Sequence, residues 1–469
     1  MLTRTLVFLS AVLACAGCAD TSDDAATDSD EVVTANEKAM ITLGAASQHT
    51  LFVRLSTRPS KELTTAVIDA AKRGVETHAL LPGTGSFDAT WMLQQHLESS
   101  GIDVDVRNDK PLEDVLVVAD DTALVPSKTG TTTKQISGAA AAALAKRFAD
   151  VLGAPAGHPG ELAAANTVTV HPMPESSRDR IVAVFGAARR SIDLEIYQLQ
   201  DRVVVEALAA AAARNVKVRV MLEPRTVGAE NYKAVSKELA AAGVTVQVTP
   251  PAFDSSHNVD HAKFAVIDDA ELIFGTGNLV RSGLGGVTER TFDNRDFWVE
   301  DTRPATVRAG KALFDADWSR RATTAADFDD FVLTPDNAND KIEALIAGAK
   351  HEVLVYNQSL GDDAIVMALI DAKNRGAKVR VLVGYQPGFG GAPPQNQAPI
   401  DKLVAAGIEA SFLRKHYLHA KAIVADGRAY IGSQNFTNGG LRNNRELGQI
   451  FDDRAAVAVV KATFESDAR

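Results

Sequence analysis

Two stretches of this chain carry side chains at a spacing that could do chemistry on a phosphate. The downstream stretch, residues 419–446, contains HAKAIVA, the tight-turn dipeptide Asp426-Gly427 and the return segment AYIGSQN, a pattern typical of a β-hairpin. Because alternate residues of a strand share a face, we expect His419 and Lys421 to point the same way. The return strand adds a hydroxyl and a carboxamide, those of Ser433 and Asn435. Together these groups can grip a phosphate and attack it.

The same set of residues occurs upstream, in HAKFAVIDDAELIFGTGN. The matched pairs are His261 and His419, Lys263 and Lys421, Asp268 and Asp426, Thr276 and Ser433, and Asn278 and Asn435. At average residue usage, one such set arises by chance in a chain of this length with a probability on the order of 10⁻⁵. Two copies therefore indicate a duplicated functional site. The second copy is one residue shorter between its aspartate and its glycine, which predicts a tighter turn and leaves the placement of Ser433 and Asn435 open.

Paired motifs of this composition suit the cleavage of a phosphodiester. One neutral imidazole can attack phosphorus, while the other, protonated, serves the leaving alkoxide. Lys263 and Lys421 can supply the positive charge that a metal ion supplies in other phosphoryl-transfer sites. No metal is expected, because these ammonium groups would repel one. The hydroxyl and amide side chains can hold phosphoryl oxygens, so four residues are substrate-binding candidates: Thr276, Asn278, Ser433 and Asn435.

On these residues the chain resembles the phospholipase D superfamily, whose signature is the duplicated HxK…D…G[ST]xN motif, and the resemblance covers roughly residues 174–469. It implies that both motifs meet in one site and that the reaction passes through a covalent phosphohistidine without a metal or other cofactor. It also implies that the aspartates of the two motifs, Asp268 and Asp426, are catalytic. The first-motif histidine is commonly the nucleophile in this family, which points to His261. The residues themselves leave His261 and His419 open.

Four acidic residues each have two possible roles. Asp268 and Asp426 sit where the hairpins should turn, so turn formation is the alternative to catalysis. Asp296 and Glu446 follow the two motifs within Asn-Arg-Asp and Asn-Arg-Glu. Each could orient an imidazole through its second ring nitrogen, or could pair with a neighbouring arginine at the surface.

The elements around the motifs repeat three times. Each unit reads as a helix and a strand, a helix and a strand again, a helix and a third strand, then the motif hairpin and a closing helix. Strands that alternate with helices predict an α/β fold with mainly parallel or mixed sheets flanked by helices. The predicted division is a signal peptide (1–18), a disordered acidic tether (19–39), a degenerate lobe (40–153), a first catalytic lobe (154–328) and a second one (329–469). Linkers are expected at 153–162 and 329–337, and the Gly/Pro-rich loop 386–399 is a candidate wall of the substrate mouth.

The first unit shows the repeat without the chemistry. Aligning LEDVLVVADDTALVPSKTG with the first motif puts Glu113 in place of the histidine and Val115 in place of the lysine, while Asp120 remains at the turn. A valine cannot hold a phosphate and a carboxylate would repel it. The two intact units must therefore pair with each other. An unrelated α/β domain is the alternative for this segment.

The N-terminal segment predicts export. Arg4 precedes an apolar run that is too short to span a bilayer, and VLACAGC resembles a bacterial lipobox. Cys18 is the expected lipidated residue and Cys15 the alternative, and a plain secretory signal is also possible. This places the protein in the cell envelope, in the periplasm, at the outer membrane or at the cell surface. The chain would be tethered to the membrane surface as a monomer whose two motif lobes pair within one chain.

Composition narrows the substrate. The formal net charge is −11, which disfavours a nucleic-acid partner. The predicted activity is hydrolysis or transphosphatidylation of phospholipid head groups. A cardiolipin synthase-like phosphatidyltransferase is the alternative, a metal-independent nuclease is a further one, and intact motifs argue against a non-enzymatic binding protein.

Overall fold

The structure is a computed structural model that describes part of the 469-residue chain. It covers residues 34–469 except 57, 83–92, 95, 98–99, 101, 108–114, 127–132, 153–162, 177, 226–228, 254, 256–257, 285–292, 325 and 389–391. The predicted signal peptide with both cysteines, most of the predicted tether, Glu113 and the linker 153–162 lie outside the described residues. Among the residues that are described, no helix combines the length and the apolarity needed to cross a bilayer.

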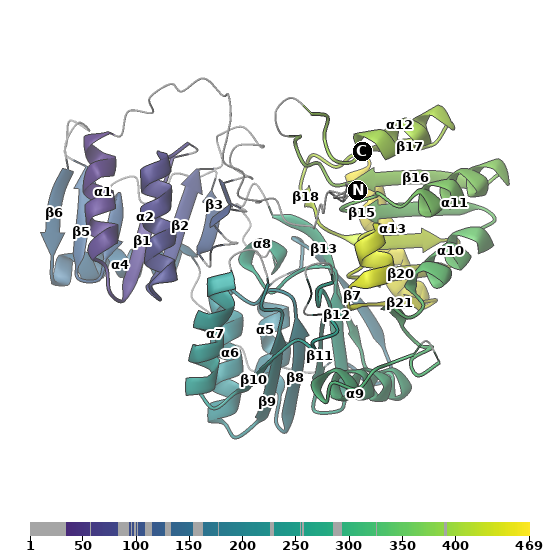
Figure 1. The fold of residues 1–469 in the computed structure, drawn as a ribbon, viewed down its shortest axis with the longest axis horizontal. Coiled ribbons are helices and arrows are strands. Elements are labelled where there is room, and N and C mark those ends of the chain that lie inside the picture. The colour runs from purple at the N-terminus through teal and green to yellow at the C-terminus, as the bar shows by residue number, and fades with distance from the viewer. Residues whose placement is uncertain are drawn as a thin grey trace, which may run out of the picture.

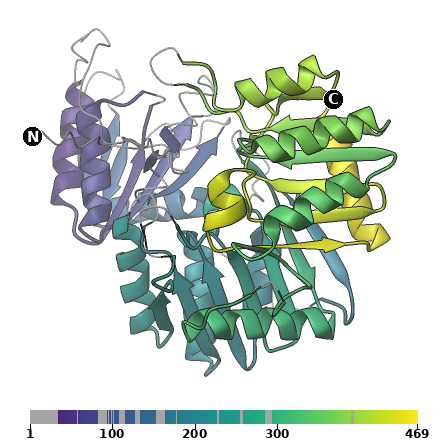
Figure 2. The same cartoon turned by 45° about the vertical axis from the view of Figure 1, so that its right-hand side comes forward.

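The chain folds into three α/β lobes, which we call the N-terminal lobe (residues 35–152), the middle lobe (168–318) and the C-terminal lobe (332–467). They appear in Figure 1 in purple, teal and green to yellow, and Figure 2 turns the C-terminal lobe forward. This α/β class, with mixed sheets flanked by helices, confirms the fold predicted from the alternating pattern.

The N-terminal lobe holds a six-stranded sheet in the order β3-β2-β1-β4-β5-β6. Its strands are β1 (Thr50–Arg54), β2 (Glu76–Pro82), β3 (Asp103–Arg107), β4 (Val117–Ala119), β5 (Thr122–Pro126) and β6 (Thr133–Ser137), and its helices include α1 (Ala35–Ala46), α2 (Lys61–Lys72) and α4 (Ala139–Leu152). Helix α1 begins inside the predicted tether, because Thr34 and Glu37 form a capping box at its N-terminus. The predicted tether of 19–39 is therefore too long by about one helical turn.

The middle lobe continues the pattern. Its strands are β7 (Val168–Met173), β8 (Ser191–Ile196), β9 (Lys217–Leu222), β10 (Thr245–Val248), β11 (Lys263–Ile267), β12 (Glu271–Gly275) and β13 (Asn294–Asp301). Its helices are α5 (Arg178–Ala187), α6 (Arg202–Ala213), α7 (Ala229–Ala241), the short α8 (Arg281–Leu284) and α9 (Pro304–Trp318).

The C-terminal lobe has corresponding elements. Its strands are β14 (Val332–Thr334), β15 (Glu352–Asn357), β16 (Lys378–Val383), β17 (Glu409–Phe412), β18 (Tyr417–Leu418), β19 (Lys421–Ala425), β20 (Arg428–Gly432) and β21 (Glu446–Phe451). Its helices are α10 (Ala338–Gly348), α11 (Asp363–Asn374), α12 (Gln397–Ala405), a π-helical turn η2 (Gly439–Asn443) and α13 (Arg454–Asp467). The segment 329–337, predicted as a linker, contains β14, because its backbone pairs antiparallel with β21.

One strand order recurs in all three lobes. The middle lobe runs β10-β9-β8-β11-β12-β13 and the C-terminal lobe runs β17-β16-β15-β19-β20-β21, which match β3-β2-β1-β4-β5-β6. In each lobe the first three strands are parallel, and the motif hairpin joins them antiparallel at the first strand. The middle and C-terminal lobes add one more antiparallel strand each, β7 and β14, beyond β13 and β21.

The middle and C-terminal lobes share a hydrophobic core. One continuous cluster of buried side chains includes Phe264, Phe297 and Phe314 from the middle lobe and Leu418, Leu447 and Phe464 from the C-terminal lobe. The N-terminal lobe has separate clusters, around Leu51 and around Phe148. Because the two motif lobes bury apolar surface against each other, they form a single packed unit, and the hydrophobic effect holds their hairpins side by side.

Candidate active site

The two histidines lie just before the hairpin strands, where the chain crosses from one lobe to the other. The alternating pattern predicted each histidine on the same hairpin strand as its lysine. Strand β11 instead begins at Lys263 and β19 at Lys421, so His261 and His419 precede the strands of their own hairpins. Their backbone amides instead bond to the other lobe. The amide of His261 donates to the carbonyl of Arg445 at 2.7 Å, and that of His419 donates to the carbonyl of Arg295 at 3.1 Å. Pairing between lobes therefore fixes both histidines.

The same exchange places each imidazole against a carboxylate from the other lobe. Nδ1 of His261 lies 2.8 Å from Oε2 of Glu446. Nδ1 of His419 lies 2.9 Å from Oδ1 of Asp296. All four side chains are buried. Each carboxylate fixes one ring nitrogen and leaves Nε2 of its histidine for chemistry, and both histidine–acid pairs need both lobes.

The motif lysines lie beside the histidines. Nζ of Lys263 donates to the carbonyl of His261 at 2.6 Å, and Nζ of Lys421 donates to that of His419 at 2.5 Å. Nζ of Lys421 also lies 3.3 Å from Nε2 of His419. Both ammonium groups are at most 1% exposed. On the middle-lobe side, the ring of Tyr197 packs edge-on against His261 with 4.7 Å between centroids and lies 5.2 Å from Nζ of Lys263.

Burial sets the protonation of this cluster. Burial, reinforced by the nearby Lys263 and Lys421, holds the pKa of His261 well below its usual range. It lowers the pKa of His419 to about 4, against the opposing effect of Asp296. Burial also lowers the pKa of Lys263 to about 7 and raises the pKa of Glu446 to about 8. Because Nδ1 of His261 and Oε2 of Glu446 share a hydrogen bond, a proton bound there belongs to the pair and not to either residue.

Comparisons with known proteins agree with this geometry. A family model described as "Cardiolipin synthase, PLD-like domain" matches residues 181–318 and 342–468, more than half of the chain. The chain belongs to this family. It is thus a member of the phospholipase D superfamily, whose enzymes carry out phosphodiester chemistry. The two matched segments correspond to the middle and C-terminal lobes, and the match does not extend to the N-terminal lobe.

Individual relatives are more distant. The probable cardiolipin synthase YwiE of Bacillus subtilis is 28% identical over 134 residues, which cover 28% of this chain and 27% of that protein. The polyphosphate kinase of Porphyromonas gingivalis has a similar fold, with 18% identity, a TM-score of 0.50 and coverage of 64% of this chain and 47% of that one. The phosphatidylserine synthase of Haemophilus influenzae is 13% identical, with a TM-score of 0.49 and coverage of 66% of this chain and 87% of that one. The chain spans about a quarter of YwiE and about half of the kinase.

The motif aspartates of this superfamily member lie away from the histidines. Oxygens of Asp268 accept hydrogen bonds from the backbone amides of residues 189–191, and those of Asp426 accept from residues 350–352, all at 2.7–2.9 Å. Each aspartate sits in the hairpin turn at the far end of a five-residue strand, roughly 15 Å or more along the chain from the lysine end. This placement corrects the prediction of catalytic aspartates: both carboxylates tie the hairpin turn to the preceding helix–strand connection.

The motif hydroxyls are also engaged inside the protein. Oγ1 of Thr276 donates to Oδ1 of Asp296 at 2.6 Å and accepts from the amide of Phe297. Oγ of Ser433 accepts from the amide of Leu447 at 3.1 Å and donates to the carbonyl of Leu447 at 3.3 Å. Thr276, predicted to bind substrate, thus donates to the acid that contacts His419. Ser433, predicted for the same role, is bonded to the backbone of the residue that follows Glu446. The shorter second hairpin closes with a two-residue loop, so its one-residue deletion does not displace Ser433.

The two motif asparagines remain in the neighbourhood of the site. Nδ2 of Asn278 donates to Oε1 of Gln198 at 2.7 Å, while its Oδ1 is buried and has no hydrogen-bond partner among the described residues. Asn435 is 3% exposed at the equivalent place. Both stay candidates for contact with substrate.

Two buried arginines, which motif reasoning assigned only to possible surface ion pairs, clamp the lobes together. Arg445 donates through Nε and Nη2 to the carboxylate of Asp317 at 2.8 and 2.6 Å. Arg295 binds Asp467 in the same way, at 2.6 and 2.9 Å. Each aspartate lies on the closing helix of the other lobe, three residues after the matched Phe314 or Phe464. Aligning the closing helices on these two phenylalanines puts Asp317 and Asp467 at the same position. That match in the sequence could have pointed to them as the partners of the arginines.

The surroundings of the two arginines differ. Near Arg445, Glu195 and Asp260 are both fully buried carboxyls that face each other and Asp317. Burial is the main cause that raises the pKa of both groups, that of Asp260 to about 7. Near Arg295 the position that matches Glu195 holds Tyr356, whose hydroxyl donates to Asp467 at 2.6 Å. The residue before His261 is thus an acid, whereas the residue before His419 is Leu418.

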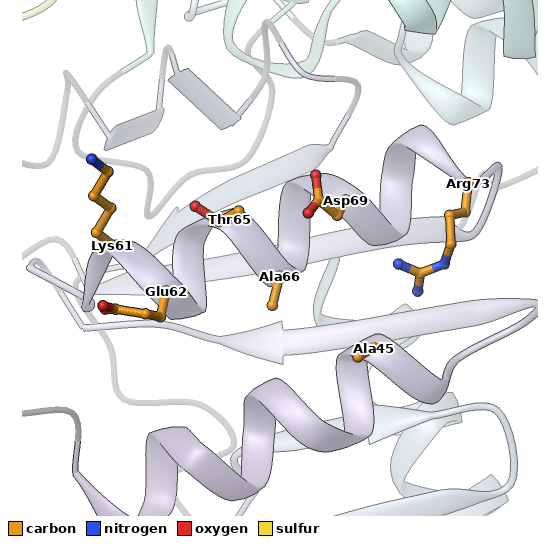
Figure 3. Close-up of a pocket in the computed structure, with 7 residues that line it drawn as sticks. All are labelled: Ala45, Lys61, Glu62, Thr65, Ala66, Asp69 and Arg73. Atoms are coloured by element: carbon orange, nitrogen blue, oxygen red, sulfur yellow. The ribbon is translucent and has the colours of Figure 1, made fainter. Parts of the chain in front are cut away.

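A hollow lies on the surface of the N-terminal lobe, between α1 and α2 (Figure 3). It is lined by Ala45, Lys61, Glu62, Thr65, Ala66, Asp69 and Arg73. Two cations and two carboxylates give this lining no net charge, and no histidine contributes to it. The described residues also contain no group of three or more His, Cys, Asp or Glu placed to hold a metal ion.

Proposed function

We propose that this superfamily member cleaves phospholipids at the head-group phosphodiester and passes the phosphatidyl group, through a phosphohistidine, to water or to an alcohol. The observation that supports this is the pair of crossed histidine–carboxylate contacts, with a buried lysine beside each histidine. Two imidazoles, each with its own orienting carboxylate, suit a two-step transfer better than a single displacement.

The residues can divide the chemistry into two balanced steps. In the first step, Nε2 of one histidine attacks phosphorus, the bond from phosphorus to the head-group oxygen breaks, and the other histidine gives its proton to that oxygen. In the second step, the histidine that gave up its proton takes one from water or an alcohol. The oxygen of that molecule attacks phosphorus, and the P–N bond to the other histidine breaks. Lys263 and Lys421 stabilise the charge on the phosphoryl oxygens in both steps. Asp296 and Glu446 hold the rings and stabilise each imidazolium.

The acceptor separates hydrolysis from transfer. The matching family model and YwiE both carry the name cardiolipin synthase, which supports a lipid alcohol as acceptor at least as well as water. The test is product analysis with phosphatidylcholine, phosphatidylglycerol and DNA in parallel. Phosphatidic acid indicates hydrolysis, and a diphosphatidyl product indicates transfer. Cleavage of DNA alone would overturn the proposal.

We also propose that the protein is an exported lipoprotein. The support is the apolar run and the VLACAGC sequence ending at Cys18, which lie outside the described residues. A Cys18→Ala variant should lose membrane association and accumulate in unprocessed or soluble form. Unchanged membrane fractionation of that variant would contradict the anchor.

A further inference from the structure

Two arginines that follow strands of the motif lobes are held differently, although they do not occupy matching positions: Arg225 follows β9, whereas Arg414 follows β17, the counterpart of β10. In the middle lobe, Arg225 follows β9, and its guanidinium is already bound. Its Nε donates to Glu223 at 3.2 Å, and its Nη2 donates to the carbonyls of Phe253 and Asn258. These contacts tie the connection after β10 to the end of β9. Arg225 therefore has a structural role.

In the C-terminal lobe, Arg414 follows β17 and is held differently. Its guanidinium carbon lies 3.4 Å from the ring centroid of Tyr385 and 5.5 Å from that of Phe412. These two rings meet edge to face at 5.3 Å. Arg414 is exposed, and no hydrogen bond or ion pair joins it to the described residues. Stacking restricts a guanidinium but leaves the N–H groups at its edge available to an anion.

The stack lies at the same end of the sheet as His419. Tyr385 follows Gly384, where an added Cβ would lie 2.6 Å from the carbonyl oxygen of Gln358 and 2.9 Å from that of Leu418. Leu418 directly precedes His419, so the chain at Gly384 passes against the residue next to the histidine. Only glycine fits this close approach without moving the backbone.

The loop 386–399 is attached to this same place. Asn396 donates through Nδ2 to the carbonyls of Gln358 and Gly384, each at 2.7 Å, and its Oδ1 accepts from the amide of Leu360 at 3.0 Å. The end of the loop is thus fixed beside the strand end that faces His419. The prediction that the loop forms a wall of the substrate mouth stays a prediction, and residues 389–391 of the loop lie outside the described residues.

We propose that Arg414 binds a second phosphate, that of an anionic lipid alcohol which accepts the phosphatidyl group. This deepens the proposed function and rests on it. The reacting phosphate has its own cations, Lys263 and Lys421, which are buried beside the histidines. Arg414 lies outside that cluster, exposed at the same end of the sheet as His419. The N–H groups along one edge of a guanidinium can bond two phosphate oxygens at once. An acceptor that carries its own phosphodiester would place its hydroxyl inward and its phosphate on Arg414.

The test measures phosphatidyl transfer by the full chain from phosphatidylcholine to two acceptors, phosphatidylglycerol and glycerol. We expect Arg414→Gln to raise the KM for phosphatidylglycerol about 10- to 100-fold, with kcat nearly unchanged, because a charge-assisted contact made in the bound state is lost. Transfer to glycerol and hydrolysis should stay at wild-type rates. Lys402→Gln removes an exposed cation of α12 and is the matched control, expected to change neither acceptor.

The outcomes separate this inference from the function on which it rests. Equal losses with both acceptors, or no change with either, would overturn the role of Arg414 while phosphatidyl transfer stands. A wild-type protein that transfers to neither acceptor and hydrolyses no phospholipid would overturn both. Inorganic phosphate, added at the acceptor concentration, should leave transfer unchanged. If it instead competes with the acceptor in the wild type and not in Arg414→Gln, the site binds free phosphate and the acceptor role is wrong.

Discussion

The middle and C-terminal lobes present the same groups to the reaction centre but support them with different side chains. Each lobe gives one histidine and one lysine, and each lends its acid to the other lobe's histidine. Behind these groups the symmetry ends. The carboxyls of Glu195 and Asp260 lie on the His261 side. The matching positions on the His419 side hold Tyr356 and Leu418. The duplicated motif therefore defines what the histidines can do, and any difference in role between them has to come from these surroundings.

Replacing either histidine should have the largest effect. We expect His261→Ala and His419→Ala each to lower kcat on phospholipid by about 10⁴-fold or more, because each step needs both imidazoles. EDTA should leave the wild type active, since lysines supply the positive charge. Acid-quenched reactions with ³²P-labelled lipid, followed by peptide mapping, would identify the histidine that carries the phosphate. A variant that keeps a tenth of the wild-type rate, or activity restored only by a divalent ion, would contradict this mechanism.

Replacing Glu446 or Asp296, the acids that each contact the histidine of the other lobe, should have the second-largest effect on kcat. Glu446→Gln and Asp296→Asn keep the shape of each side chain but remove its charge, and we expect kcat to fall about 10²- to 10⁴-fold. Double-mutant cycles test the exchange between lobes. His261 should couple strongly with Glu446 and much less with Asp296. The opposite pattern would mean that each lobe orients its own histidine.

The pH dependence of kcat/KM should show a smaller effect that comes from the middle lobe, through Lys263. Since the pKa of Lys263 is lowered to about 7, its ammonium is lost as pH rises through that value, and kcat/KM should fall on the alkaline side. Below about pH 4, protonation of His419 should remove a nucleophile or base. Lys263→Arg keeps its charge and should move the alkaline limb to higher pH. Lys421→Arg is the matched control, because it shows how much a larger side chain alone lowers kcat/KM. An alkaline limb that stays in place in Lys263→Arg would assign it to another group.

The turn aspartates should affect stability more than catalysis. Asp120, Asp268 and Asp426 all have positive φ, between 52° and 55°, and each accepts bonds from three consecutive backbone amides. We expect Asp268→Ala and Asp426→Ala each to cost about 2 kcal/mol in the free energy of unfolding. Urea denaturation measures this, and kcat per folded molecule should stay within about twofold. A large loss of kcat in a folded variant would return these residues to the catalytic set.

Much of the fold could be predicted from the sequence, because hydrophobic periodicity and the Asp-Gly turn are local signals. The strands β7 and β14 were missed. β14 has only three residues, β7 contains Pro172, both strands are followed by a proline, and both pair only with partners far away in the sequence. The same limit applies to the site. The motif spacing identified His261 and His419, but nothing local says that Glu446 serves the first and Asp296 the second. That exchange arises from strand pairing between the lobes, as does the burial of Arg295 and Arg445.

The exchange of partners between lobes has a consequence for how this chain can evolve. Arg445 reaches Asp317, Arg295 reaches Asp467, and each orienting acid serves a histidine encoded more than a hundred residues away. Neither copy of the motif can be deleted, shuffled into another gene or allowed to drift alone, because a change in one lobe has to be matched in the other. The N-terminal lobe has its own core, and its described residues share none of these exchanged contacts, so a substitution there needs no matching change in the motif lobes.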